Sequence, residues 1–149
     1  MSDNSTSSRP LNVLVMAAGM GTRMKSKRAK VLHELGGLPM IAYVVRAAQA
    51  LEPRRIFVIV GHQAEEVERA VLAEAGELAG FVVQEKQRGT GDAVESARGV
   101  LENSDSLVLV LSGDVPMIHT ETLRKFIEHH RNTGATCSIL SVRLENPTG

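Results

Sequence analysis

The sequence has few of the residues that mark several classes of protein. It contains a single cysteine, Cys137, no tryptophan, and aromatic residues at only 3% of its positions. One cysteine excludes an internal disulfide framework and a zinc site built from several cysteines. Because free cysteine is usually buried, and Cys137 lies in a strand-like run, we expect a buried and inert thiol.

The chain also lacks an excess of charge and a long apolar run. It holds 17 basic and 17 acidic residues, so its formal net charge is zero. This balance argues against whole-domain attraction to nucleic acid or to a membrane, and the scarcity of aromatic residues further disfavours a nucleic-acid binder. The apolar runs 13–18 and 40–45 are far too short to span a membrane. Residues 1–10 show no signal-peptide pattern, which predicts a cytoplasmic protein.

The length and the apolar content predict one compact domain after a polar tail. The chain has 149 residues, of which 43% are hydrophobic, and a chain of this size can bury an ordinary core. Residues 1–10 include four serines, and we predict that they form a disordered tail. The folded domain is predicted to span residues 11–149.

Short apolar runs alternate with amphipathic stretches along this domain. Strands buried on both faces are predicted at 11–18, 56–60, 81–83, 107–111 and 135–142. Helices are predicted at 39–51, 65–75, 91–101 and 120–132. The alternation predicts an α/β fold with three layers, in which helices cover both faces of a mostly parallel sheet. Ligands bind beyond the carboxyl ends of the strands in such folds, so the candidate site lies in the loops that follow them.

A glycine-rich, basic loop follows the first predicted strand. It reads AAGMGTRMKSKRAK from Ala17 to Lys30. Its two glycines let the backbone approach an anion and direct N–H groups at it. Five of the 17 basic residues fall between Arg23 and Lys30, so a polyphosphate is the expected partner. A nucleic-acid binder that uses this cluster, or a solvated basic loop without a ligand, is the alternative.

Three better-known phosphate-binding motifs do not fit this loop. The dinucleotide-binding fingerprint needs a third glycine where the chain has Met24. The P-loop needs glycine at the same position, immediately before Lys25. The glycine loop of kinases fails for the same reason and lacks its downstream motifs.

Four motifs together resemble the sugar-1-phosphate nucleotidylyltransferase family. After the first loop come KVLH at 30–33, QEKQRGTGDA at 84–93, GDVP at 113–116 and NPTG at 146–149. In this order they are similar to the pyrophosphorylase domain of bacterial bifunctional N-acetylglucosamine-1-phosphate uridylyltransferases. The first loop alone would also be shared with cytidylyltransferases and molybdopterin guanylyltransferases, whereas KVLH and the Gly-Thr segment are more specific.

The resemblance implies a Rossmann-like nucleotidyltransferase fold and a Mg²⁺-dependent reaction. A uridylyl group would pass from UTP to N-acetylglucosamine 1-phosphate, giving pyrophosphate and UDP-N-acetylglucosamine, a precursor of the peptidoglycan cell wall. Such a transfer builds negative charge on phosphate oxygens, which cationic side chains and a metal ion stabilise. Another nucleotide, another acceptor (a hexose 1-phosphate or molybdopterin), or a nucleotide-binding module without turnover is the alternative.

The resemblance also implies roles for individual residues. Arg23 and Lys30 would be the catalytic residues that hold the triphosphate, and Asp114 would bind Mg²⁺. The uracil and ribose would contact backbone groups of Met16, Ala17, Ala18 and Gly19, and the uracil would also contact Gln84, Gly89 and Thr90. The remaining predicted substrate-binding residues are Gly21, Thr22, Gln87, Ser112 and Gly113.

The chain departs from the family pattern at two positions and in its extent. Family members usually carry proline before the lysine, where this chain has Ala29, and the change leaves the segment less restricted in the unfolded chain. Ser112 stands where close relatives often have tyrosine. The resemblance places the acceptor-binding half, and an acetyltransferase domain through which such proteins trimerise, outside these residues. We therefore expect a sheet that is incomplete at the C-terminus, nucleotide binding, and weak or absent turnover.

Overall fold

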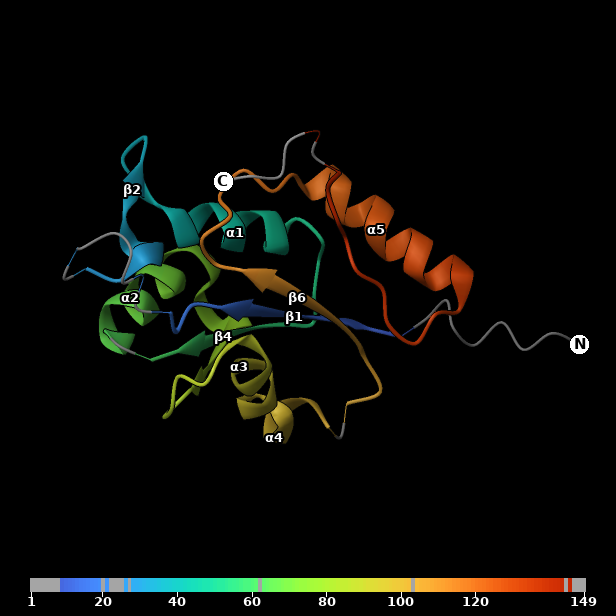
Figure 1. The fold of residues 1–149 in the computed structure, drawn as a ribbon, viewed down its shortest axis with the longest axis horizontal. Helices are drawn as coiled ribbons and strands as arrows, with labels where there is room; N and C mark the ends of the chain where they lie inside the picture. Colours follow the sequence, from blue (N-terminus) through green and yellow to red (C-terminus); the bar gives the residue numbers. More distant parts are fainter. Residues whose placement is uncertain are drawn as a thin grey trace, which may run out of the picture.

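A computed structural model describes residues 9–19, 21, 26, 28–61, 63–102, 104–143 and 145. Its main sheet has four parallel strands in the order β5-β4-β1-β6 (Figure 1). The strands are β1 (Leu11–Met16), β4 (Arg55–Val60), β5 (Ala79–Val83) and β6 (Leu107–Ser112). A separate antiparallel hairpin pairs β2 (Glu34–Leu35) with β3 (Leu38–Pro39).

The connections between the parallel strands contain the helices α1 (Met40–Gln49), α2 (Ala64–Ala75), α3 (Thr90–Ser96) and α4 (Arg98–Leu101), and α5 (Thr120–Thr133) follows β6. Two short 3-10 turns are η3 (Lys30–Leu32), which follows β1, and η4 (Gly76–Leu78), which follows α2. The apolar residues of α1 recur at helical spacing, and the helix starts directly after Pro39. The predicted helix 91–101 is divided into α3 and α4 at Ala97.

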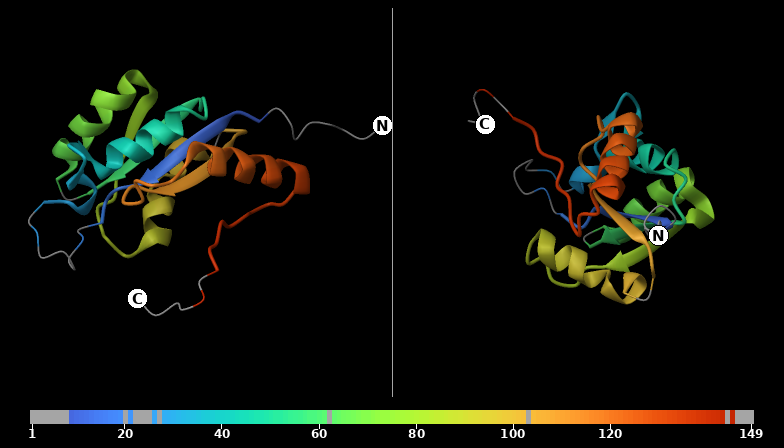
Figure 2. Two further views of the ribbon diagram at one scale, coloured as in Figure 1. Left: turned by 90° about the horizontal axis from the view of Figure 1, so that it is seen from above. Right: turned by 90° about the vertical axis from the view of Figure 1, so that its right-hand side faces the viewer.

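The helices cover both faces of the sheet. Val13 and Val15 of β1 belong to the larger core cluster, together with buried residues of α1, α2 and α5. Leu14 points to the opposite face, where it clusters with Ala93 and Ala97. Successive residues of a strand face opposite sides of a sheet, so this central strand is buried on both faces. Figure 2 shows α3 and α4 on one side of the sheet and the other helices on the opposite side. The predicted three-layer parallel fold is confirmed.

The fifth predicted strand is wrong. Residues 135–143 form no strand and lead away from the sheet after α5 ends at Gly134 (Figure 2). Ile139 and Val142 are 85% and 77% exposed. An apolar pattern indicates that residues suit a pleated, half-buried surface. A strand also needs a neighbouring strand with which to pair, and the pattern does not show that one is present. The expected burial of Cys137 depended on this strand, and Cys137 is in fact exposed.

Within the described ranges, none of the helices combines the length and the apolar character needed to cross a membrane.

Candidate active site

A cleft of about 490 Å³ opens at the carboxyl ends of β1 and β6. Two backbone hydrogen bonds hold the loops that form it. Ala17 N–H donates to the Ile59 carbonyl, and Gly113 N–H donates to the Met16 carbonyl, each at 2.9 Å. The cleft is lined by Met16, Ala17, Ala18, Gly19, Gly21, Lys30, Val31, Gln87, Gly89, Thr90, Ala93, Ser112 and Asp114.

Most of the predicted site residues meet in this cleft, although they come from distant parts of the chain. Gln84 and Gly113 do not line it and lie behind its wall. Thr22 and Arg23 lie outside the described residues. The sequence did not single out Val31 and Ala93, although both fall within motifs that it did, KVLH and the Gly-Thr segment. The roles assigned to all these residues stay predictions.

Lys30 and Asp114 form an ion pair inside the cleft. Lys30 Nζ donates to Asp114 Oδ2 at 2.6 Å, and Ser112 Oγ donates to Asp114 Oδ1 at 2.6 Å. Burial alone would raise the pKa of the Asp114 carboxyl. The hydrogen bonds from Lys30 and Ser112, together with the charge of Lys30, outweigh burial and hold this pKa below its ordinary value. The carboxylate is therefore ionised at neutral pH.

Two glycines allow close approaches of the backbone around the cleft. Gly21 has a φ of +58°, and a Cβ at this position would lie 2.7 Å from Lys30 Cβ. A Cβ on Gly113 would lie 2.9 Å from the Met16 carbonyl oxygen. Real Cβ atoms do not come this close to other heavy atoms, so the geometry of the cleft requires glycine at both positions.

The opposite wall is built from the segment between β5 and α3. Gln87 Nε2 donates to the Ala18 carbonyl at 2.6 Å and so joins this segment to the first loop. Gln84 is only 6% exposed, and its Nε2 donates to Asp92 Oδ2 at 2.8 Å. The same nitrogen lies 3.4 Å from the Gly89 carbonyl oxygen. The buried Gln84 amide thus supports the wall from behind.

Asp114 suits a divalent cation that prefers oxygen ligands. Mg²⁺ binds through one or two carboxylates and keeps water and substrate phosphates as its other ligands. In the part of the chain that the structure describes, no group of three or more His, Cys, Asp or Glu side chains could hold a metal ion by itself. A single carboxylate in this cleft therefore fits Mg²⁺ better than a metal held by protein ligands alone.

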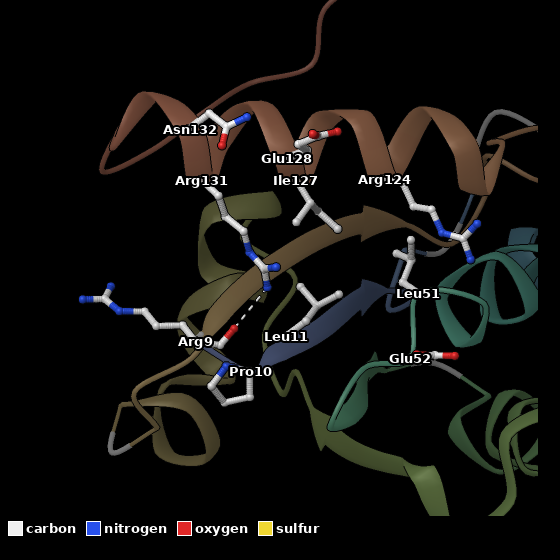
Figure 3. Close-up of a pocket in the computed structure, with 10 residues that line it drawn as sticks. All are labelled: Arg9, Pro10, Leu11, Leu51, Glu52, Arg124, Ile127, Glu128, Arg131 and Asn132. Carbon is white, nitrogen blue, oxygen red and sulfur yellow. Dashed lines mark hydrogen bonds between the residues drawn. The ribbon is translucent and has the colours of Figure 1, made fainter. Parts of the chain in front are cut away.

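A second and larger cavity, of about 820 Å³, lies beneath α5 near Leu11, at the amino end of β1 (Figure 3). Arg124 donates to the Ala50 carbonyl at 2.6 Å, and Arg131 donates to the Arg9 carbonyl at 3.1 Å. Figure 3 shows that the three arginine side chains point in different directions. They do not converge on one ligand, so the smaller cleft is the better candidate site.

Comparisons with known proteins find a family model and relatives that match most of this chain. The family model for MobA-like NTP transferase domains matches residues 13–147. The chain is 49% identical to the bifunctional protein GlmU of Rubrobacter xylanophilus over 143 residues, which are 96% of this chain and 30% of that protein. It is 48% identical to the bifunctional protein GlmU of Geobacter metallireducens over 139 residues, which are 93% of this chain and 29% of that protein.

The chain therefore spans about 30% of the length of these curated relatives. Among solved structures, it is similar to a UDP-glucose pyrophosphorylase complexed with UDP-glucose, with a TM-score of 0.69 and 18% sequence identity. That match covers 84% of this chain and 55% of the other. At this level of identity the likeness concerns the fold alone.

Proposed function

The chain belongs to the family of MobA-like NTP transferase domains, and on this basis we propose that it is the nucleotide-binding part of a uridylyltransferase. The donor would be UTP and the acceptor N-acetylglucosamine 1-phosphate. The observation that supports this most is the pairing of Lys30 with Asp114 beside a glycine-rich loop, at the carboxyl ends of two parallel strands. The KVLH and Gly-Thr motifs, together with 49% identity to a GlmU protein, favour this donor and acceptor.

The reaction needs charge neutralisation and positioning more than it needs a protein nucleophile. A phosphate oxygen of the sugar 1-phosphate forms a bond to the α-phosphorus of UTP, the bond from that phosphorus to the bridging oxygen breaks, and pyrophosphate leaves. The attacking oxygen is already ionised, so no general base is needed to activate it, and its direct attack on phosphorus requires no covalent enzyme intermediate. Cationic groups that meet the developing charge lower the barrier.

Several predicted site residues have parts that their chemistry supports. Lys30 binds phosphate oxygens as a mobile point charge, and Arg23, outside the described residues, adds a planar fork of donors. Asp114 holds Mg²⁺, which when bound neutralises phosphate charge. The backbone of Met16 to Gly19 contacts ribose and base, since these residues border the same cleft.

Base selection falls to the wall of the cleft that carries Gly89 and Thr90, with the buried Gln84 amide directly behind it. Gln84 Nε2 donates to Asp92 Oδ2, and this contact orients the Gln84 amide with its nitrogen toward α3. The Gln84 carbonyl oxygen is then the end that accepts a hydrogen bond from an N–H of the base. Uracil carries such an N–H at N3, whereas cytosine carries a lone pair there.

Calorimetric titration with UTP, CTP, GTP and ATP, with and without Mg²⁺, tests the proposal. We expect selective binding of UTP that weakens in Lys30→Ala. Preference for another nucleotide would favour a transferase with a different donor, and binding without pyrophosphate release in the full-length protein would favour a module without turnover. Rapid pyrophosphate release by these 149 residues alone would contradict the assignment of acceptor binding to a further part of the protein.

A further inference from the structure

One side chain ties the segment that carries Lys30 to the start of α2. The N–H of Ala29 donates to Gln63 Oε1, 34 residues along the chain. Ala29 is only 2% exposed. A buried N–H that loses its acceptor is costly, so this bond restrains the backbone immediately before Lys30. Lys30 in turn directs its Nζ at Asp114 across the cleft.

Gln63 makes this bond from a backbone conformation that residues with a Cβ seldom adopt. Its φ is 58° and its ψ is 37°, in the left-handed region. Its backbone carbonyl accepts hydrogen bonds from Glu66 N–H and Val67 N–H, each at 3.2 Å, at the beginning of α2. The side chain makes no capping bond to the helix. Strain of this kind persists where the surrounding structure requires it, often at functional sites.

Ala29 has the backbone conformation that proline would hold by itself. Its φ is −55° and its ψ is 138°, and the ring of proline fixes φ close to this value. Proline, however, has no N–H and could not donate to Gln63. The alanine at this position therefore lacks the restraint of a ring and has instead the restraint of a hydrogen bond.

We propose that Gln63 is a positioning residue for Lys30, whose hydrogen bond to Ala29 replaces the restraint that a proline ring would provide. The inference rests on the proposed function in one respect, namely that Lys30 contacts the phosphates of the nucleotide. The bond itself can be tested without any nucleotide.

Gln63→Gly tests this role without creating new strain, because glycine accepts a φ of 58° more readily than glutamine does. Gln49→Ala is the matched control. Gln49 Nε2 donates to the Glu74 carbonyl at 3.0 Å and joins α1 to α2 at residues that do not line the cleft. Both variants remove one glutamine side chain that bridges two segments. Two properties are measured in each: hydrogen exchange of the Ala29 amide, and affinity for UTP with Mg²⁺.

We expect Gln63→Gly to speed exchange of the Ala29 amide and to weaken UTP binding about tenfold, the effect of one lost hydrogen bond. Gln49→Ala should change neither. Relief of the strained backbone at position 63 should offset the cost of the unpaired Ala29 N–H, so Gln63→Gly should lose affinity with little change in its thermal midpoint. A merely structural role would lower stability and affinity together.

The double variant Ala29→Pro/Gln63→Gly provides the rescue. The ring restores the restraint, and the missing N–H no longer needs an acceptor, so UTP affinity should return to within about threefold of the original chain. Ala29→Pro alone should bind UTP more weakly than the double variant, because the ring then abuts Gln63 Oε1.

The possible failures are distinguishable. If Gln63→Gly leaves both exchange of the Ala29 amide and UTP affinity unchanged, the positioning role is overturned while the uridylyltransferase proposal stands. If the original chain binds no nucleotide, the proposed function fails. Hydrogen exchange of the Ala29 amide then tests the Ala29–Gln63 hydrogen bond by itself. Rapid exchange of this amide in the original chain would overturn the positioning role as well.

Discussion

Lys30 Nζ lies 2.6 Å from Asp114 Oδ2, although the two residues are 84 positions apart in the chain. The cation that we propose for phosphate thereby neutralises the carboxylate that we propose for Mg²⁺. The pair must separate before each partner can bind its own ligand. Each ligand should therefore favour binding of the other, because the first to bind frees the partner that the second requires.

Lys30→Met should change metal and nucleotide binding in opposite directions. Removing the lysine frees the Asp114 carboxylate, so affinity for Mn²⁺ in the absence of nucleotide should rise by up to about fivefold, the size expected for a partly exposed ion pair. Affinity for UTP with Mg²⁺ should fall. Titration of Mn²⁺ followed by electron paramagnetic resonance measures the first effect, and calorimetry the second. Lys125→Met, which removes an exposed lysine of α5, is the control. A loss of Mn²⁺ affinity in Lys30→Met would argue against the exchange of partners.

The carboxyl of Asp114 should titrate below its ordinary pKa of 3.8. Because its pKa is lower in the folded chain, the carboxylate contributes stability above about pH 4, the pKa of an unfolded aspartate. That contribution is lost as the pH falls through the folded pKa. Carbon NMR of the Asp114 carboxyl should show a higher pKa in Lys30→Met and in Ser112→Ala. An Asp114 pKa that stays at the value of the original chain in both variants would mean that neither donor stabilises the carboxylate.

Gly21→Ala should weaken nucleotide binding through Lys30. The new Cβ would lie 2.7 Å from Lys30 Cβ, in a backbone with φ +58°. Backbone strain alone should lower the free energy of unfolding by about 1 kcal/mol. Gly37→Ala is matched, because Gly37 also has a positive φ (+86°) but has no other atom within 4 Å of an added Cβ. Both variants should lose stability in urea unfolding, but only Gly21→Ala should lose UTP affinity. Equal UTP affinity in the two variants would show that Gly21 serves the turn alone.

Gln87→Glu should break the contact that joins the first loop to the segment before α3. The ionised carboxylate cannot donate to the Ala18 carbonyl and repels it, so the bond at 2.6 Å is lost. UTP affinity should fall about fivefold, somewhat less than for a fully buried bond. Gln87→Leu removes the donor without adding charge, which separates the lost bond from repulsion of the triphosphate. If Gln87→Leu binds UTP with the affinity of the original chain, the hydrogen bond to Ala18 does not contribute to nucleotide binding.

The apolar residues after α5 should make this chain associate as its concentration rises. Ile139 and Val142 are exposed, and β6 stands at the end of the strand order. An exposed sheet edge and exposed apolar residues each favour association between chains. Sedimentation velocity should show concentration-dependent association that Ile139→Lys/Val142→Lys reduces. A chain that stays monomeric at every concentration would contradict this.

Much of the fold could be predicted because the relevant information is local. Val13, Leu14 and Val15 indicate a strand buried on both faces, since both alternating sides of the run are apolar. The sequence motifs likewise predicted most of the cleft lining, because parallel strands place their carboxyl-end loops at one edge. The strand predicted at 135–142 failed because pairing depends on a neighbour that periodicity does not specify.

By itself, then, the sequence determined the four parallel strands, most of the helices and the basic, glycine-rich loop, since these depend on the spacing of residues near one another in the chain. It did not predict the short hairpin of β2 and β3. Only the tertiary structure decided that Lys30 pairs with Asp114 and that Gln63 holds Ala29. Neither contact has a local signature. Each arises because the crossover connections of a parallel sheet bring distant loops to the same end of the strands.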